Sequence, residues 1–330
     1  MWPRHSPRTL GRLKNRSLVL LSGEGTTIPA AEAKSLFLTY DPGSQFLSPS
    51  PRVLIAESSA DPYLVSSRIA FARRVGALLG SRDDAKRALR GHRISFRSFD
   101  LASGLDPADP GDYLAGVDAE VDLESPEFEL TVVRGKEEYL AVSSPGMMKQ
   151  GWSLRRPRQR TFFHPSAIFP KLSRALVNMS RCREGEIFLD PFAGTGSIPM
   201  EAFIVGAQVV AADRSAQMVR GALSNMTHFD QEWTGVLRAD ATVSPVTRVD
   251  AVATDVPYGR ASSTGGLETR VIIDRVLPSL ANMLRPSSFL VLMHPQQVEV
   301  RPNPDFEVVE EHHLHVHKLL TRTITILRRR

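Results

Sequence analysis

Apolar and polar residues alternate in two different ways along the chain, and the change comes near residue 171. After it, five short apolar runs are separated by stretches with the 3.6-residue spacing of helices; the runs cover 186–190, 209–212, 235–239, 249–254 and 289–293. Strands that alternate with helices form parallel sheets with right-handed crossovers. We therefore expect an α/β, Rossmann-like sheet, extended by an antiparallel pair at 306–317 and 320–327.

The first half has a different order, with helices first and most strands afterwards. The spacing predicts strands at 17–21, 53–57, 94–99, 128–133 and 139–143 and helices at 28–40, 70–79 and 83–89. Residues 117–124 alternate strictly between apolar and acidic side chains, which predicts a half-buried strand or an extended edge. This half is expected to be an α+β module.

These patterns divide the chain into four parts. Residues 1–16 are a basic arm, 17–145 the α+β module, 146–170 a linker and 171–330 the α/β domain. The prolines of the linker exclude one continuous helix there.

The composition, 42% hydrophobic and 23% charged, is typical of a soluble globular protein. A single cysteine, Cys182, excludes an intramolecular disulfide and any multi-cysteine metal site, and we expect it to be a small buried apolar residue. No apolar run reaches the roughly 18 residues of a membrane span, and no secretion signal follows the N-terminus. We expect a cytoplasmic monomer without a membrane partner.

Positive charge is concentrated in a few stretches. The net charge is only +5, but residues 1–16, residues 139–183 and the chain after Glu311 contain basic residues and no acid. Charge segregated in this way favours a nucleic acid partner over a solvated basic surface.

The linker combines arginines with aromatic residues. They are Trp152, Arg155, Arg156, Arg158, Arg160, Phe162 and Phe163. Aromatics can stack on bases while arginines neutralise phosphates, so we predict that the four arginines bind RNA. Docking of the two phenylalanines onto a domain core explains them equally well.

Acidic residues follow or end four predicted strands of the α/β domain. They are Asp190, Asp213, Asp240 and Asp255. The carboxyl ends of parallel strands meet at one edge, where ligands bind in open α/β sheets. Each acid alone could be a helix N-cap, but four together indicate a ligand site, because burying carboxylates without partners is costly.

Gly194 and Gly196 follow the first of these acids and precede a helix, so the backbone there can approach a ligand closely. With Asp213 at the next strand end, where dinucleotide folds hold ribose hydroxyls, the pattern fits NAD or S-adenosylmethionine. NAD is disfavoured, because Pro199 stands where a pyrophosphate loop needs a third glycine and Asp190 would repel a diphosphate. S-adenosylmethionine is the better candidate.

Two motifs resemble those of known enzymes. Residues 190–196, Asp-Pro-Phe-Ala-Gly-Thr-Gly, and 254–259, Thr-Asp-Val-Pro-Tyr-Gly, resemble class I amino-methyltransferases, whose catalytic loop reads (Asp/Asn)-Pro-Pro-(Tyr/Phe). Residues 116–126, 160–166 and 315–322 extend the resemblance, over about 65–330, to the archaeal tRNA guanine-10 N2-methyltransferases and their eukaryotic relatives. Those enzymes carry a THUMP domain ahead of the catalytic one, and residues 17–60 resemble the ferredoxin-like domain before it.

The resemblance implies roles for the residues at matching positions. Asp190, Ala193, Gly194 and Gly196 would hold the amino-acid part of S-adenosylmethionine, Asp213 its ribose and Asp240 its adenine amino group. His164, Pro165 and Ser166 would close over the cofactor, and Asp255, Val256, Pro257 and Tyr258 would take the guanine. The expected reaction is methyl transfer to N2 of guanine 10 in tRNA, giving N2-methyl- or N2,N2-dimethylguanosine.

The residues of this loop suit that reaction. The guanine amine is a poor nucleophile because its lone pair is delocalised into the ring. The Asp255 carboxylate and the Val256 carbonyl can each accept one N–H, which fixes the amine and stabilises its developing positive charge. Pro257 stiffens the loop, and Tyr258 offers a face on which a displaced base stacks. Val256 stands where proline is usual; it keeps the carbonyl but not the fixed φ, so a looser loop is expected.

Other functions fit parts of the sequence. They are a THUMP enzyme for another tRNA guanine such as position 6, an N6-adenine or N4-cytosine DNA methyltransferase, and a non-catalytic tRNA-binding protein with a relict pocket. The THUMP-like half argues against the DNA enzymes, and a relict pocket would give no heat of S-adenosylmethionine binding. No metal is expected at the histidine-rich residues 312–317, because alternate residues on one strand face lie about 7 Å apart.

Overall fold

The computed structural model describes most of the chain. The described residues are 15–23, 27–101, 116–146, 150–243, 245–257, 269–301, 303–317 and 320–330. Most of the predicted basic arm and the catalytic candidate Tyr258 lie outside them. The chain forms two compact units: an N-terminal unit of Met1–Gly23 and Tyr40–Gln150, and a C-terminal unit of Glu24–Thr39 and Gly151–Arg330.

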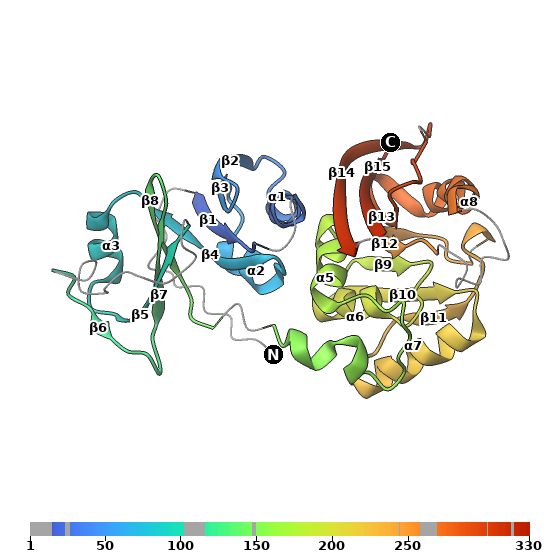
Figure 1. Ribbon diagram of the computed structural model, residues 1–330, viewed down its shortest axis with the longest axis horizontal. Coiled ribbons are helices and arrows are strands. Elements are labelled where there is room, and N and C mark those ends of the chain that lie inside the picture. Colours follow the sequence, from blue (N-terminus) through green and yellow to red (C-terminus); the bar gives the residue numbers. More distant parts are fainter. Residues whose placement is uncertain are drawn as a thin grey trace. The chain divides into compact units, whose positions relative to one another are not determined.

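The N-terminal unit is built on one eight-stranded sheet with the order β2-β3-β1-β4-β8-β7-β5-β6. Its strands are β1 Arg16–Leu21, β2 Gln45–Ser50, β3 Val53–Glu57, β4 Ala72–Leu79, β5 Arg93–Asp100, β6 Glu120–Val121, β7 Phe128–Arg134 and β8 Glu138–Ser143, and its helices are α2 Pro62–Arg68 and α3 Arg82–Leu89. Both helices begin at a capping side chain, Asp61 for α2 and Ser81 for α3. The α+β character predicted for this half is confirmed (Figure 1).

One prediction for this unit is wrong. Residues 70–79 were expected to be a helix, but β4 lies there and pairs with both β1 and β8. Pairing on both sides overrides the helical propensity of its alanines and leucines. Gly76 is the residue that marks the close packing, since a Cβ there would lie 2.7 Å from the Val142 carbonyl oxygen.

The acidic stretch 117–124 forms an extended edge, the second of the two alternatives that its pattern predicted, and not a half-buried strand. Only the two residues of β6 pair, with the edge of β5, and both are exposed. Val117 and Ala119 pack partly against the core, whereas Leu123 is 73% exposed. The alternating pattern therefore predicted a longer strand than the one that forms, because the core covers the apolar side chains over only part of the stretch.

The C-terminal unit contains a seven-stranded sheet with the order β11-β10-β9-β12-β13-β15-β14. Its strands are β9 Ile187–Asp190, β10 Gln208–Asp213, β11 Gly235–Arg238, β12 Val249–Asp255, β13 Leu284–Pro295, β14 Phe306–His317 and β15 Leu320–Arg329, and its helices are α1 Ile28–Tyr40, α5 Pro170–Met179, α6 Ser197–Ile204, α7 Ala216–His228 and α8 Thr269–Met283. Short 3₁₀ turns lie at η2 Trp152–Arg155, η3 Pro157–Gln159 and η4 Ala241–Val243.

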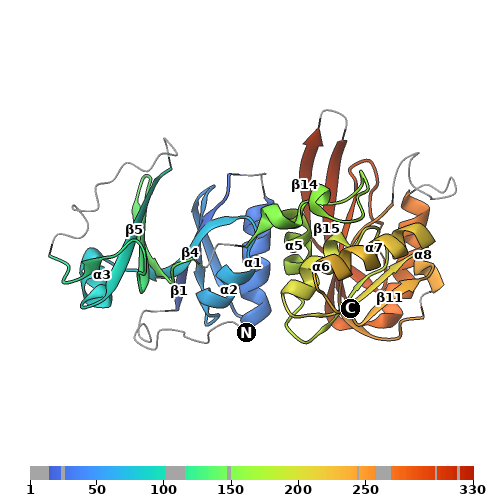
Figure 2. The ribbon, with the colours of Figure 1, turned by 90° about the horizontal axis from the view of Figure 1, so that it is seen from below.

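The pairing in this sheet confirms the predicted α/β, Rossmann-like architecture. The strands from β11 to β13 pair in parallel, and β15 and β14 add an antiparallel pair at one edge (Figures 1 and 2). The chain leaves β9 toward β10 and later returns to β12 on the other side of β9. Ligands of open α/β sheets bind at such a reversal, so the ends of β9 and β12 are the place to look for a site.

Helix α1 belongs to the C-terminal unit although the chain reaches it before most of the N-terminal unit. Glu32, on α1, is fully buried and accepts a hydrogen bond of 2.7 Å from the Asn178 amide on α5. Thr27, just before the helix, lies 2.9 Å from the His312 ring on β14. An early segment of the sequence therefore forms part of the C-terminal unit.

Candidate functional site

Four acidic residues are found where the sequence placed them, at or just after the carboxyl ends of four strands. Asp190, Asp213 and Asp255 are the last residues of β9, β10 and β12, and Asp240 follows β11 by two residues. Because these strands are parallel neighbours, the acids share one edge of the sheet. The predicted row of acids is confirmed.

Asp190 is the most deeply buried member of the row, with 1% of its surface exposed. Its Oδ1 accepts hydrogen bonds from the Thr254 hydroxyl at 2.6 Å and from the Phe192 N–H at 3.1 Å. Burial raises the pKa of Asp190 to about 7, while these two donors oppose the rise. The bond to Thr254 ties the end of β9 to the end of β12 across the reversal point.

The loop after β9, residues 191–196, is called the glycine loop. Its two glycines are required for different structural reasons. Gly196 has φ of +81°, and a Cβ there would lie 2.6 Å from the Trp233 ring, so packing requires it. Gly194 has φ of +52°, and among the described atoms the nearest to its added Cβ is the Phe192 carbonyl oxygen at 4.0 Å. Its backbone therefore borders open space that a ligand can enter.

Asp213 supports this loop from the neighbouring strand. Its Oδ2 accepts the Gly194 N–H at 2.9 Å and its Oδ1 accepts the Ser215 N–H at 2.8 Å. Burial raises the pKa of Asp213, and the two backbone donors lower it. Each oxygen keeps a further lone pair, so the carboxylate can bind a hydroxyl while it holds the loop.

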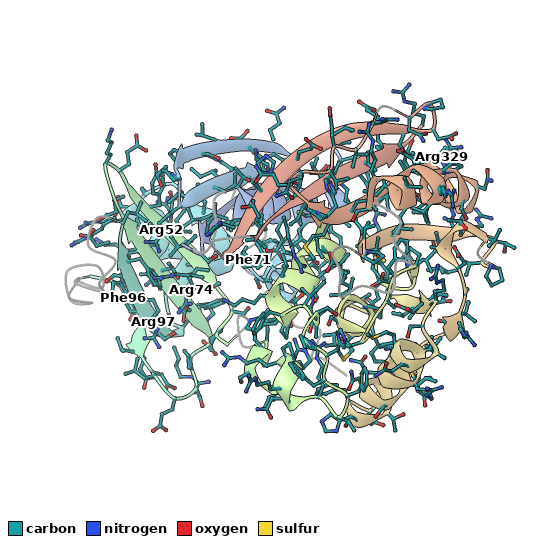
Figure 3. All side chains as sticks on the ribbon, turned by 45° about the vertical axis from the view of Figure 1, so that its right-hand side comes forward. Arg52, Phe71, Arg74, Phe96, Arg97 and Arg329 are labelled. Carbon is teal, nitrogen blue, oxygen red and sulfur yellow. The ribbon has the colours of Figure 1, made fainter. Side chains whose placement is uncertain are left out.

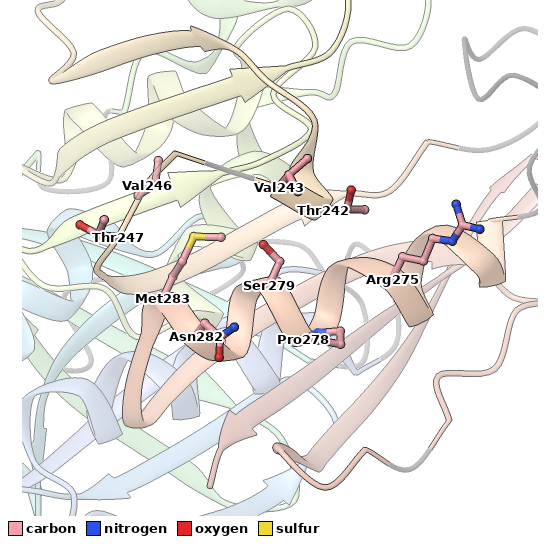
Figure 4. A pocket seen from close by; sticks show the side chains of 9 residues that line it. All are labelled: Thr242, Val243, Val246, Thr247, Arg275, Pro278, Ser279, Asn282 and Met283. Carbon is pink, nitrogen blue, oxygen red and sulfur yellow. The ribbon is translucent and has the colours of Figure 1, made fainter.

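Asp240 behaves as a cap. Its Oδ1 accepts the backbone N–H and the hydroxyl of Thr242, the middle residue of η4, and these bonds lower its pKa. The N-cap interpretation considered for each acid therefore describes this one. Thr242 also lines a hollow of about 420 Å³ between η4 and α8, to which Asp190 and Asp255 do not contribute (Figure 4).

Asp255 has two unlike carboxylate oxygens. Its Oδ2 accepts a hydrogen bond of 2.9 Å from Arg322 of β15, whereas its Oδ1 is buried and has no hydrogen-bond partner among the described residues. The two side chains are 16% and 11% exposed. Burial raises the pKa of Asp255 to about 7, and Arg322 opposes the rise. A buried, unsatisfied acceptor at the reversal point is suited to a ligand that donates an N–H.

Val256 and Pro257 form the turn that leaves β12. The Val256 side chain is fully buried in the core under α8, and its N–H donates to the Met293 carbonyl at 2.9 Å. The Pro257 carbonyl accepts a hydrogen bond from the Thr269 hydroxyl at 3.2 Å. The looser loop expected from the missing proline is thus offset by a ladder bond that proline cannot make.

Two of the four linker arginines predicted to bind RNA are used inside the protein. Arg155 pairs with Glu201 at 2.7 Å, and Glu201 also pairs with the buried Arg174. Arg160 is 6% exposed and donates to the Ser197 hydroxyl and to a backbone carbonyl, and burial lowers its pKa to about 10. For these two the prediction is corrected, because their donors face internal acceptors.

Arg156 and Arg158, the other two linker arginines, are exposed, and their RNA role stays a prediction.

The linker then forms a strap over the glycine loop, defined as residues 160–168. Asn225 of α7 holds this strap by three hydrogen bonds. Its side-chain oxygen accepts the Phe162 N–H at 2.8 Å, and its side-chain nitrogen donates to the carbonyls of Phe162 and Thr195, each at 3.0 Å. A Cβ on Gly221 would lie 2.0 Å from the Phe162 ring. Docking therefore explains Phe162, while Phe163 is 48% exposed.

His164, Pro165 and Ser166, which were predicted to cover the cofactor, lie between the anchored ends of this strap. His164 Nδ1 lies 2.7 Å from the Ser166 hydroxyl, which fixes the turn. At the far end, the Ile168 N–H donates to the Ser197 hydroxyl at 3.2 Å. The strap is thus tied to the start of α6, next to the glycine loop.

Sequence patterns did not reveal two residues of this site. Arg322 was counted with the basic tail and within the resembling stretch 315–322, without a role of its own, and Asn225 was not singled out. Arg322 reaches Asp255 because β15 pairs with β13, whose Met293 stands opposite Asp255 in the register. A contact that depends on three paired strands leaves no local signal in the sequence.

Two further expectations concern metals and membranes. In the described part of the chain, no group of three histidine, cysteine, aspartate or glutamate side chains could hold a metal ion, and Cys182 is buried. His313 lies 3.0 Å from the Thr323 hydroxyl on the neighbouring strand. Among the described residues, no helix is long and apolar enough to cross a membrane.

Comparison with known proteins places the chain among methyltransferases. The family described as RMKL-like, methyltransferase domain, matches residues 157–314. The chain is 27% identical over 332 residues to the tRNA (guanine(10)-N2)-dimethyltransferase of Methanothermobacter thermautotrophicus, covering 94% of this chain and 99% of that protein. It is 30% identical over 168 residues to a probable enzyme of the same name from Methanothermococcus thermolithotrophicus, covering 48% of this chain and 98% of that protein. A structure of TrmN from Thermus thermophilus aligns over 96% of this chain and all of that one, with 20% identity and a TM-score of 0.49.

Proposed function

The chain belongs to the family of archaeal tRNA (guanine(10)-N2)-dimethyltransferases, and from this premise we propose that it methylates the exocyclic N2 of guanine 10 in tRNA, once or twice, with S-adenosylmethionine as methyl donor. The observation that carries the proposal is the buried Oδ1 of Asp255, which has no partner among the described residues and lies at the reversal point of the sheet. This oxygen can accept a hydrogen bond from an N–H group, and the exocyclic amine of guanine can donate one.

The residues around the glycine loop fit the methyl donor. Gly194 borders open space, Asp213 has lone pairs left for ribose hydroxyls, and the buried carboxyl of Asp190 stands ready for a cationic amino group. When bound, S-adenosylmethionine supplies a methyl group activated by a sulfonium. We assign the amino-acid part to Asp190, Ala193, Gly194 and Gly196, the ribose to Asp213, the adenine amino group to Asp240 and the cover to His164, Pro165 and Ser166.

The residues after β12 would then hold the guanine. Asp255 Oδ1 accepts one N–H of the amine and the Val256 carbonyl accepts the other, which leaves the nitrogen lone pair free to attack. The negative charge of Asp255 stabilises the positive charge that develops on the nitrogen. Pro257 keeps the turn rigid through its bond to Thr269, and Tyr258 is assigned to stack on the displaced base.

Two regions are proposed to hold the rest of the tRNA. The N-terminal unit is the candidate RNA-binding module; its sheet carries arginines such as Arg74 and Arg97, and Arg52 lies in the turn between β2 and β3 (Figure 3). Arg74 is engaged with Glu129 at 2.5 Å, whereas Arg97 is exposed. In the linker, Arg156 and Arg158 are free of the internal bonds that hold Arg155 and Arg160 and are proposed to contact phosphates.

The deciding experiment is nucleoside mass spectrometry of an unmodified tRNA after incubation with the protein and methyl-labelled S-adenosylmethionine. Label on N2 of guanine 10 is expected, and unlabelled tRNA or label on another nucleotide, including guanine 6, contradicts the proposal. Asp255→Ala should reduce transfer at least 100-fold, because it removes the acceptor that fixes the amine. Its tRNA affinity should stay within a few fold of the wild type; an equal loss of affinity would show that Asp255 is structural.

A further inference from the structure

Arg322 is the charged side chain in contact with the residue proposed to hold the guanine amine. Its Nη1 donates to Asp255 Oδ2 at 2.9 Å and lies 3.7 Å from the Met293 sulfur. Arg322 is only 9% exposed, so solvent screens the pair little. It comes from β15, two strands away from β12, and reaches across β13.

We propose that Arg322 is a positioning residue for methyl transfer: by holding Oδ2, it turns Oδ1 of Asp255 toward the substrate amine and keeps the carboxylate ionised. This inference rests on the proposed function, since it names the partner that makes Asp255 competent. Arg322 occupies one oxygen of the carboxylate, while the other, which has no hydrogen-bond partner among the described residues, keeps its full accepting capacity for a ligand.

The pair has a cost as well as a benefit for the reaction. A carboxylate already paired with a cation attracts the developing charge on the nitrogen less strongly than an isolated one. An isolated carboxyl buried at this place would, however, take up a proton and become unable to accept from the amine. With Arg322 in place, the carboxylate attracts the charge on the nitrogen less strongly, but Asp255 is more often in its reactive, ionised form.

The charges around Asp255 support this role. On β9, Asp190 is a second acid, whose pKa the charge of Asp255 helps to raise, and β13 presents the uncharged sulfur of Met293. Two arginines of the helices on this sheet have partners elsewhere: Arg174 on α5 pairs with Glu201, and Arg270 on α8 pairs with Asp274. His294 lies on the opposite face of β13, where its Nε2 contacts the Thr325 hydroxyl at 2.9 Å. Among these groups, Arg322 is the cation that favours the carboxylate.

The test is the pH dependence of single-turnover methyl transfer, measured with saturating S-adenosylmethionine and unmodified tRNA. In the wild type, transfer requires the ionised carboxylate and should be lost as the pH falls below about 7, the value to which burial raises the pKa of Asp255. Arg322→Gln should slow transfer roughly 10- to 100-fold at pH 7. In this variant, the acidic limb of the pH–rate profile should also move to higher pH by more than one unit. Part of the methyl-transfer rate should therefore return at pH 9.

Two further variants separate positioning from folding. Arg322→Lys keeps the charge but not the planar fork, so its limb should stay near that of the wild type with a smaller loss of rate. Arg328→Gln removes an arginine from the same strand, where it forms an exposed ion pair with Glu307, and should leave the profile unchanged. If Arg322→Gln does not fold, the Arg322→Lys variant still tests the proposal. A methyl-transfer rate and an acidic limb both identical to those of the wild type would overturn it.

Carbon NMR of the Asp255 carboxyl, assigned with Asp255→Asn, tests the pair even without turnover. The pKa of Asp255 should rise in Arg322→Gln. An unchanged pKa, or a rate lowered equally at every pH, would show that Arg322 is only structural. A wild-type protein that transfers no methyl group would instead overturn the proposed function, while the NMR titration would still report on Arg322.

Discussion

Val256 shows how one substitution in a motif can be compensated at the scale of a residue. Its N–H donates to the Met293 carbonyl and its side chain is buried in the core under α8. Val256→Pro restores the residue usual in the motif but removes this donor, so it should lower the free energy of unfolding by about 1–3 kcal/mol. Urea denaturation measures the change. A variant more stable than the wild type would show that the fixed φ of proline outweighs the hydrogen bond.

The sequence predicted the acids of the site better than it predicted their partners. Asp190, Asp213 and Asp255 were found because each ends an apolar run, which is a local pattern. Arg322 was not found, because its contact depends on the order of strands in the sheet. Arg160 was misassigned for a related reason: a basic stretch does not reveal which of its side chains will be buried.

At the scale of elements, the strap of residues 160–168 is held mainly by one side chain from α7. Asn225 is fully buried and makes three hydrogen bonds, two to the backbone of Phe162 and one to the Thr195 carbonyl. Asn225→Ala should weaken S-adenosylmethionine binding roughly 10-fold, because two or more backbone groups lose partners and the strap loosens. Isothermal calorimetry measures the affinity.

Thr227→Ala, at an exposed position two residues further along α7, is the matched control and should bind the cofactor as the wild type does. Unchanged affinity in Asn225→Ala, with a lower unfolding temperature, would mean that the strap stabilises the fold without covering the cofactor.

The elements themselves were predictable where one period dominated. The alternation of strands and helices after residue 171 gave the parallel part of the sheet, and the final antiparallel pair was also correct. The pattern misled at β4, whose residues Ala72–Leu79 favour helix locally but pair with strands on both sides. Long-range pairing of this kind has no signature in a window of ten residues.

At the scale of the whole molecule, helix α1 makes the catalytic half depend on a segment far away in sequence. A fragment of residues 151–330 contains the whole seven-stranded sheet but lacks the partners of Asn178 and His312, namely Glu32 and Thr27. It also lacks the Thr39 carbonyl that accepts a hydrogen bond from Arg183. Division of the chain at the linker, as the sequence suggests, would therefore expose a surface that α1 covers.

The matched protein for comparison joins residues 24–39 to residue 151 by a flexible glycine–serine linker. We expect the fragment to unfold at least 5 °C below this protein, because each kcal/mol of lost stability lowers the unfolding temperature by about 2–4 °C. Differential scanning calorimetry of the two proteins measures the shift. Glu32→Ala in the joined protein should remove part of the gain, since it removes the hydrogen bond that Glu32 accepts from the buried Asn178 amide. Equal unfolding temperatures for the fragment and the joined protein would show that α1 contributes nothing to the catalytic half, and that the early segment serves only the N-terminal unit.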